Sequence, residues 1–201
     1  MKLIALTTAG MNPVDGKVYL YTKEMDLSRF GFFEKGSYEE MINFTSRESL
    51  QKLKKGVRYT IDADIYMVHA ITSERDNFAV FAFADKDYPK RVAYLALEEA
   101  LTAFNSTVGE SWKGNKDKNI ASPAFKQVFM KFKSATEVDK LTLANKKVDE
   151  TQAVLIQNMK VLLEGHEKLD DMLQKSEDLS AKTKMFAKNT EKMNKKCCNL
   201  I

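Results

Sequence analysis

The alternation of apolar and polar residues divides the chain into two unlike parts. Before about residue 134, short apolar runs alternate with turn residues. One run, Phe78 to Ala84, is apolar throughout, so we expect it in the centre of a sheet with both faces covered. Together the runs predict five strands, at residues 2–8, 17–23, 57–62, 64–72 and 77–84.

Helical patterns separate and follow these strands. A capping box at 37–40 predicts a helix through about residue 54, whose apolar set is wide enough to leave one side partly open. Pro89 opens a second helix at its first helical position, and Gly109 ends it. After a polar loop from 110 to 121, Ser122 starts a short third helix. The order ββαβββαα predicts an α+β fold with a five-stranded antiparallel sheet and helices on its faces.

The second part of the chain has one continuous pattern. Core-sized, small and polar residues alternate at spacings of three and four, and Gly165 is the only helix breaker after residue 137. This spacing is the seam of a left-handed coiled coil and predicts one long helix, or a helix broken once, from about 137 to 196. The seam is too varied for a two-stranded zipper, so we expect partner helices to complete a bundle. The seam positions are Leu141, Ala144, Val148, Thr151, Leu155, Asn158, Leu162, Gly165, Leu169, Met172, Ser176, Leu179, Thr183, Phe186, Thr190 and Met193.

Both cysteines lie at the end of the chain. Cys198 begins a C-a-a-X sequence ending in Ile201, which makes Cys198 a predicted prenylation site and Cys197 a site for palmitoylation or another second lipid. Farnesyl and geranylgeranyl both remain open. One lipid attaches a protein marginally and two attach it stably. Six lysines from 182 to 196 would add ~1 kcal/mol each at an anionic surface. We therefore expect domains 1–134, 135–196 (coil and basic tail) and 197–201 (lipidated end).

Several classes of function are disfavoured by composition and spacing. The balance of 32 basic and 28 acidic residues lacks the basic excess of a nucleic-acid binder, and no apolar run approaches the ~20 residues of a membrane span. The glycines at 10 and 16 miss P-loop spacing, which argues against nucleotide binding. His69, in an apolar strand, is expected to be a hydrogen-bonded core residue. We expect no enzyme, no metal and no cofactor other than covalent lipids.

Several short motifs occur in a fixed order along this α+β head, sixteen-position seam and paired-cysteine end. They are Phe32-Phe33, Asn43 to Ser46, Asp87 to Ala93, Leu162 to Glu164, Glu167 to Asp171, Lys175 to Glu177 and Cys197-Cys198. In this order and spacing they resemble the prenylated longin-type R-SNAREs, membrane-fusion proteins that lack a transmembrane segment. The resemblance covers essentially the whole chain.

The resemblance implies a longin (profilin-like) domain that folds back on its own SNARE helix and shelters the prenyl group. It makes Phe44 the autoinhibitory contact, although an ordinary core position would also suit Phe44. The open form would join three Q-type SNARE helices in a four-helix bundle for fusion in ER, Golgi, endosomal or vacuolar transport. We expect the protein to cycle between the cytoplasm and the cytosolic face of these membranes.

One position departs from the family pattern. The family's central seam position is an arginine that hydrogen-bonds three partner glutamines, and Gly165 stands there in this chain. Three buried amides would lose their charged partner, at ~1–3 kcal/mol for each group left unsatisfied. His166 is next to the seam, where a solvated histidine is the simpler interpretation. The alternative function is therefore an inhibitory SNARE, or a lipid-dependent adaptor with a coil that does not drive fusion.

Overall fold

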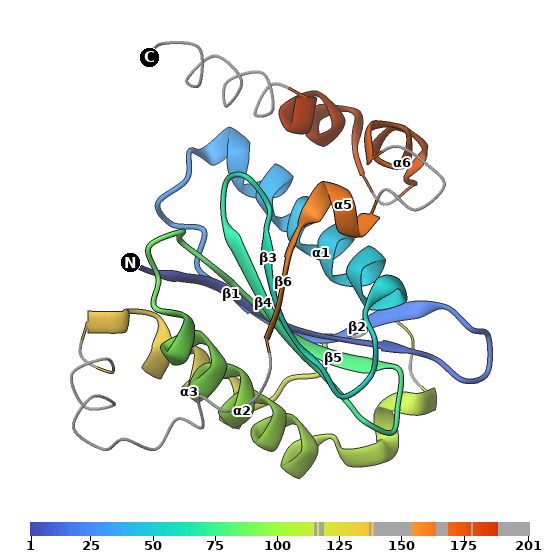
Figure 1. The fold of residues 1–201 in the computed structure, drawn as a ribbon, viewed down its shortest axis with the longest axis vertical. Coiled ribbons are helices and arrows are strands. Elements are labelled where there is room, and N and C mark those ends of the chain that lie inside the picture. Colours follow the sequence, from blue (N-terminus) through green and yellow to red (C-terminus); the bar gives the residue numbers. More distant parts are fainter. Residues whose placement is uncertain are drawn as a thin grey trace.

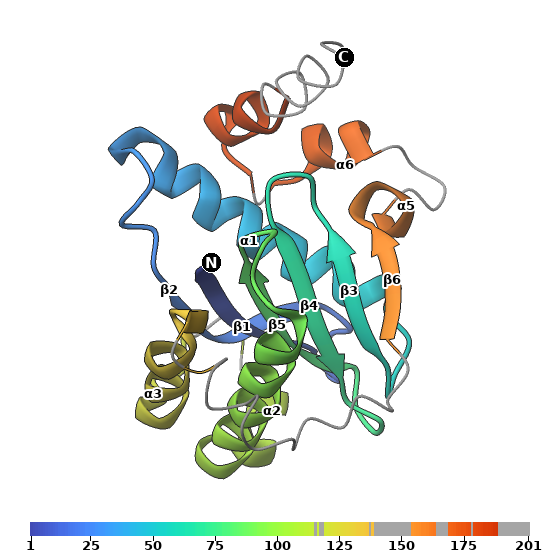
Figure 2. The same cartoon turned by 60° about the vertical axis from the view of Figure 1, so that its left-hand side comes forward.

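A twisted sheet lies between two layers of helices in the computed structural model (Figures 1 and 2). The structure describes residues 1–114, 116, 119–136, 138, 154–163, 169–177 and 179–188. The sheet has six strands in the order β2-β1-β5-β4-β3-β6. Their bounds are β1 Leu3–Met11, β2 Val18–Met25, β3 Arg58–Asp62, β4 Met67–Thr72, β5 Phe78–Ala84 and β6 Val154–Asn158.

The five strands expected in the first part are confirmed, and they pair antiparallel. All seven residues of β5 are buried. Alternate side chains of β5 enter the two cores of the protein: Val80 lies in the core under α2 and α3, and Phe81 in the core under α1. The apolar run therefore marks a central strand covered on both faces, as the pattern predicts.

Helices α2 (Lys90–Thr107) and α3 (Pro123–Phe132) cover one face of the sheet, and α1 (Phe32–Lys52) covers the other (Figure 2). The cap predicted at residue 37 is wrong by six residues, because the observed cap is Gly31 and α1 begins at Phe32. The Glu34 carboxylate accepts a hydrogen bond of 3.1 Å from the Gly31 N–H, so the capping interaction forms between residues 31 and 34 and not between 37 and 40.

Two smaller boundaries also differ from expectation. Pro89 is the cap that precedes α2 and not its first residue, because its carbonyl accepts the Val92 N–H. The 3-10 helix η1 (Gly109–Gly114) occupies part of the predicted polar loop and buries Trp112 against the α2 core. Ser122 caps α3 as expected, its hydroxyl accepting from the Phe125 N–H at 3.2 Å.

The described part of the predicted coil does not form one helix. Val154–Asn158 forms β6, which pairs parallel with β3, and it is followed by helices α5 (Met159–Leu163) and α6 (Leu169–Lys175) and a helical segment at 181–188. The five-stranded prediction becomes six strands for this reason. Without β6, one edge of β3 would have unpaired backbone N–H and C=O groups. The backbone of β6 pairs with these groups, and its apolar residues 154–156 suit a strand.

Candidate functional site

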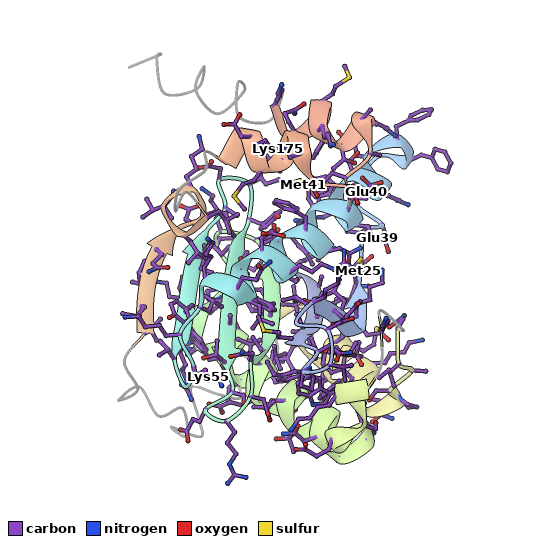
Figure 3. The ribbon with its side chains drawn as sticks, turned by 90° about the vertical axis from the view of Figure 1, so that its right-hand side faces the viewer. Met25, Glu39, Glu40, Met41, Lys55 and Lys175 are labelled. Carbon is purple, nitrogen blue, oxygen red and sulfur yellow. The ribbon has the colours of Figure 1, made fainter. Side chains whose placement is uncertain are left out.

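The C-terminal segment, by which we mean the described residues 154–163, 169–177 and 179–188, lies against α1 and the edge of β3 (Figure 3). Met159, Leu163, Leu173 and Leu179 bury their side chains in the core that also contains Phe44 of α1. Each of the four is at most 7% exposed. This amounts to roughly 1.5–3 kcal/mol of hydrophobic stabilisation per side chain, before the cost of ordering the segment.

A hydrogen bond fastens the far end of this segment to α1. The backbone N–H of Ser180 donates to Glu40 Oε2 at 2.7 Å, and the Ser180 hydroxyl accepts from the Thr183 N–H at 3.2 Å as the cap of segment 181–188. Partial burial alone would raise the pKa of the Glu40 carboxyl. Hydrogen bonds from the Ser180 N–H and the Thr183 hydroxyl outweigh this effect and hold that pKa below its usual value.

Glu40 and Met41 lie on the side of α1 that faces the C-terminal helices, as Figure 3 shows. Glu39 points the other way and pairs with Lys23 of β2 at 2.6 Å. Neighbouring carboxylates on one helix therefore hold different parts of the molecule, the C-terminal segment and the sheet.

Aromatic rings continue the contact beyond Glu40. Tyr38 stacks on Phe30 with ring centroids 3.8 Å apart, and it also meets Phe186 of segment 181–188 edge to face at 5.2 Å. Burial raises the pKa of the Tyr38 hydroxyl. The phenol is neutral at physiological pH even at its ordinary pKa, and burial favours the neutral form further, so the ring can take part in this largely apolar contact.

An apolar cavity of about 90 Å³ remains between α1, the turn from β3 to β4 and the C-terminal segment. Its walls include Phe44, Tyr66, Leu163, Leu173 and Phe186. Phe44 is 3% exposed, so the residue expected as the autoinhibitory contact is buried where head and C-terminal segment meet. Most of the side chains that line the cavity are apolar, so head and C-terminal segment meet here mainly through packing.

The seam positions have mixed environments. Leu155 and Asn158 are exposed, while Leu179 and Thr183 are buried. Leu162, Met172, Ser176 and Phe186 are half-buried, and Leu169 begins α6. The remaining seam positions and both lipidation sites lie outside the described residues: Leu141, Ala144, Val148, Thr151, Gly165, Thr190, Met193, Cys197 and Cys198.

Three contact residues were missed by the seam pattern. Met159, Leu163 and Leu173 each follow a seam position by one residue and are more buried than that position. The signal was available, because apolar residues beside the seam make the apolar stripe wider than a coiled coil needs. In this conformation the segment packs through the residues beside the seam, and seam positions such as Leu155 and Asn158 stay exposed.

Other chemistry is sparse in the described ranges. His69 is fully buried, and its Nδ1 atom lies 3.0 Å from the Thr60 hydroxyl, as expected of a core histidine. Burial lowers the pKa of His69 to about 4. Within the described ranges, no group of three His, Cys, Asp or Glu side chains could hold a metal ion. No described helix combines the length and apolar character needed to cross a membrane.

Comparison with known proteins matches both parts of the chain. The longin family, described as a regulated-SNARE-like domain, matches residues 27–129, and the synaptobrevin family matches residues 140–200. The chain is 31% identical over 202 residues to the VAMP-like protein YKT61 of Arabidopsis thaliana, covering 100% of both chains. It is 33% identical over 179 residues to the putative synaptobrevin homolog YKT6 of Dictyostelium discoideum, covering 88% of each. With the synaptobrevin homolog ykt6 of Schizosaccharomyces pombe it shares 29% identity over 199 residues, 98% of each chain.

Proposed function

Since this chain belongs to the longin-type R-SNAREs, we propose that it contributes one helix to a four-helix bundle with three Q-type SNARE helices. The bundle draws a vesicle and its target membrane together in ER, Golgi, endosomal or vacuolar transport. The helix comes from residues 135–196, and its seam supplies the buried layers. The family and the names of its relatives support a role in vesicle traffic; the Q-type partners are our proposal.

The observation that carries the proposal is the conformation of the C-terminal segment. Residues 154–158 are paired with β3 as a strand, and a backbone cannot be strand and bundle helix at once. Entry into the bundle then requires release of β6 from β3 and of the following helices from α1. The head therefore acts as an inhibitor of its own SNARE segment, with Phe44 at the centre of the contact.

Lipidation of the terminal cysteines would make membrane attachment reversible. Cys198 carries the isoprenoid and Cys197 the second lipid, so loss of the second lipid returns the protein to the cytoplasm. The apolar cavity beside Phe44 is the place where an isoprenoid would be sheltered. Its volume of about 90 Å³ is below the ~150 Å³ that holds one benzene molecule, so the C-terminal segment would have to move outward to admit the chain.

Gly165 supports a second candidate function. Glycine supplies no donor to the glutamines of a central bundle layer and lowers helix stability by ~1 kcal/mol relative to alanine. A bundle weakened at this layer would occupy Q-type partners without driving fusion. The chain would then be an inhibitory SNARE or a lipid-dependent adaptor.

Assembly of the full chain with Q-type SNARE helices tests both candidates. Wild type and Gly165→Arg are mixed with matched Q-type sets, and the complexes are isolated by size exclusion and melted. A stable wild-type complex that arginine hardly changes supports the fusion role, which vesicle-fusion assays can then measure. Tight assembly of Gly165→Arg alone supports the inhibitory role. If neither assembles, even with Phe44→Glu added to release the segment, the bundle proposal is wrong.

A further inference from the structure

The first turn of α1 carries two adjacent aromatic side chains that the fold leaves in solvent. Phe32 is 85% exposed and Phe33 75%, and their rings meet edge to face at 5.5 Å. Phe30, two residues earlier, is instead held in the structure by its stacking on Tyr38. The closed contact between α1 and the C-terminal segment therefore uses one aromatic of this sequence and leaves the next two uncovered.

The surroundings of the two exposed rings are basic. Lys182 places its Nζ atom 5.4 Å from the centroid of the Phe33 ring. Segment 181–188 contains three lysines and no acidic residue, and Lys182, Met185 and Lys188 form its exposed face. Met185 is itself 66% exposed. We call these five residues, Phe32, Phe33, Lys182, Met185 and Lys188, the aromatic tip.

Two carboxylates of α1 form hydrogen bonds within the protein. Glu34 accepts the Gly31 N–H, and Glu40 accepts the Ser180 N–H. The tip thus combines large exposed apolar groups with two exposed lysines, Lys182 and Lys188. Figure 3 shows the part of the molecule to which it belongs, where the N-terminal end of α1 lies beside the C-terminal helical segments.

We propose that the aromatic tip inserts into the surface of an anionic membrane. Phe32, Phe33 and Met185 enter the boundary between headgroups and acyl chains, while Lys182 and Lys188 bind anionic headgroups. Aromatic rings and lysines on one small surface suit this boundary, because the rings leave water while the ammonium groups stay with the headgroups. The charge complementarity favours a lipid surface over an apolar protein groove, which would strip water from the lysines.

Binding of the aromatic tip to a membrane would also hold the C-terminal cysteines close to that membrane. Lys188 is nine residues before Cys197, so an extended chain reaches at most about 30 Å from one to the other. A tip seated on the bilayer brings the C-terminal end within reach of the membrane. This contact is made by the closed conformation, and it requires neither the SNARE bundle nor a lipidated cysteine.

Vesicle flotation of the full, unlipidated chain tests the proposal. Phosphatidylcholine vesicles with and without phosphatidylserine are the probes, and the Phe32→Ser/Phe33→Ser variant is compared with wild type. We expect wild type to bind the phosphatidylserine vesicles and the double variant to bind them about tenfold more weakly. A Phe33→Trp variant should gain fluorescence quenching by brominated lipids, whereas the buried Trp112 alone should not.

Met130→Ser on α3 is the matched control. Met130 is 57% exposed, and α3 covers the face of the sheet opposite to α1, the helix that carries Phe32 and Phe33 (Figure 2). This variant should bind vesicles like wild type. All variants should have the same melting temperature as wild type, because the altered side chains are largely in solvent.

Three results would overturn the proposal. Wild type could fail to bind the anionic vesicles, or the double phenylalanine variant could bind as well as wild type, which would assign binding to the lysines alone. Alternatively, wild type could ignore vesicles and self-associate in analytical ultracentrifugation through Phe32 and Phe33. The tip would then be an interface between copies of the chain.

Discussion

The backbone N–H of Ser180 and the carboxylate of Glu40 meet at 2.7 Å although 140 residues separate them in the chain. The bond joins Glu40, in the third turn of α1, to the cap of segment 181–188. It satisfies an N–H at a helix N-terminus that would otherwise need water, and it places a negative charge where the helix dipole favours one.

Replacing Glu40 with alanine should loosen the C-terminal segment. Loss of a partly exposed charge-assisted hydrogen bond should cost about 1 kcal/mol, or roughly fivefold in the opening equilibrium. Hydrogen exchange of the amides at 179–188 measures this opening. Glu39→Ala is the control, because Glu39 pairs with Lys23 and should leave exchange in this segment unchanged. Equal exchange in both variants would contradict a fastening role for Glu40.

Phe44→Glu should open the closed form. Phe44 is 3% exposed beside the C-terminal segment, and burying a carboxylate there without a partner is strongly unfavourable. Limited proteolysis should cut the segment at 154–188 faster than in wild type, whereas Phe44→Leu should stay protected. Trp112 lies in the opposite core, so its fluorescence reports whether the head is still folded. Unchanged protease sensitivity in a folded Phe44→Glu variant would refute the autoinhibitory contact.

Gly10→Ala should destabilise the head by ~1–3 kcal/mol. A Cβ atom at this position of β1 would lie 2.8 Å from a Trp112 ring carbon and 3.0 Å from Tyr21, so the rings would have to shift. Urea unfolding measures the loss. Gly36→Ala in α1 is the matched control, since its Cβ meets nothing within 4 Å and alanine favours the helix by ~0.5–1 kcal/mol. Equal stability of the two variants would show that the strand accommodates the added methyl.

His69→Phe should flatten the pH dependence of stability between pH 6.5 and about 4. The pKa of His69 is lowered to about 4 by burial, so on acidification the unfolded state binds its proton first. In wild type the free energy of unfolding should therefore fall by roughly 3 kcal/mol across this window, and the His69 contribution should level off below it.

Phenylalanine at position 69 removes that titration at little cost near neutral pH. The Thr60 hydroxyl keeps Tyr94 as a partner at 2.9 Å, and the His69 Nε2 atom has no hydrogen-bond partner among the described residues. Denaturant midpoints at pH 7, 5.5 and 4.5 give the comparison. If the free energy of unfolding falls with pH as steeply in the variant as in wild type, groups other than His69 cause the loss of stability in acid.

The amino-acid sequence by itself determined the architecture of the head. The apolar run at 78–84 predicted a strand covered on both faces, and Ser122 and Gly109 marked helix ends through local chemistry. These features depend on neighbours within a few residues, which the pattern contains directly. The start of α1 also depends on neighbouring residues, the Gly31 N–H and the Glu34 carboxylate. In the sequence, however, a glycine followed by a glutamate is a weaker sign of a helix start than the serine and glutamate of the capping box predicted at 37–40.

Only the tertiary structure decided the conformation of the C-terminal segment. The spacing at 154–158 suits a helix whose seam meets partner helices, whereas the edge of β3 offers backbone partners that make the same residues a strand. Met159 and Leu163 are buried against α1 because that helix presents apolar side chains such as Ile42 and Phe44. The spacing of apolar residues indicates which faces of the segment can be buried. Which face is buried depends on the surface available, here the head and in a bundle the partner helices.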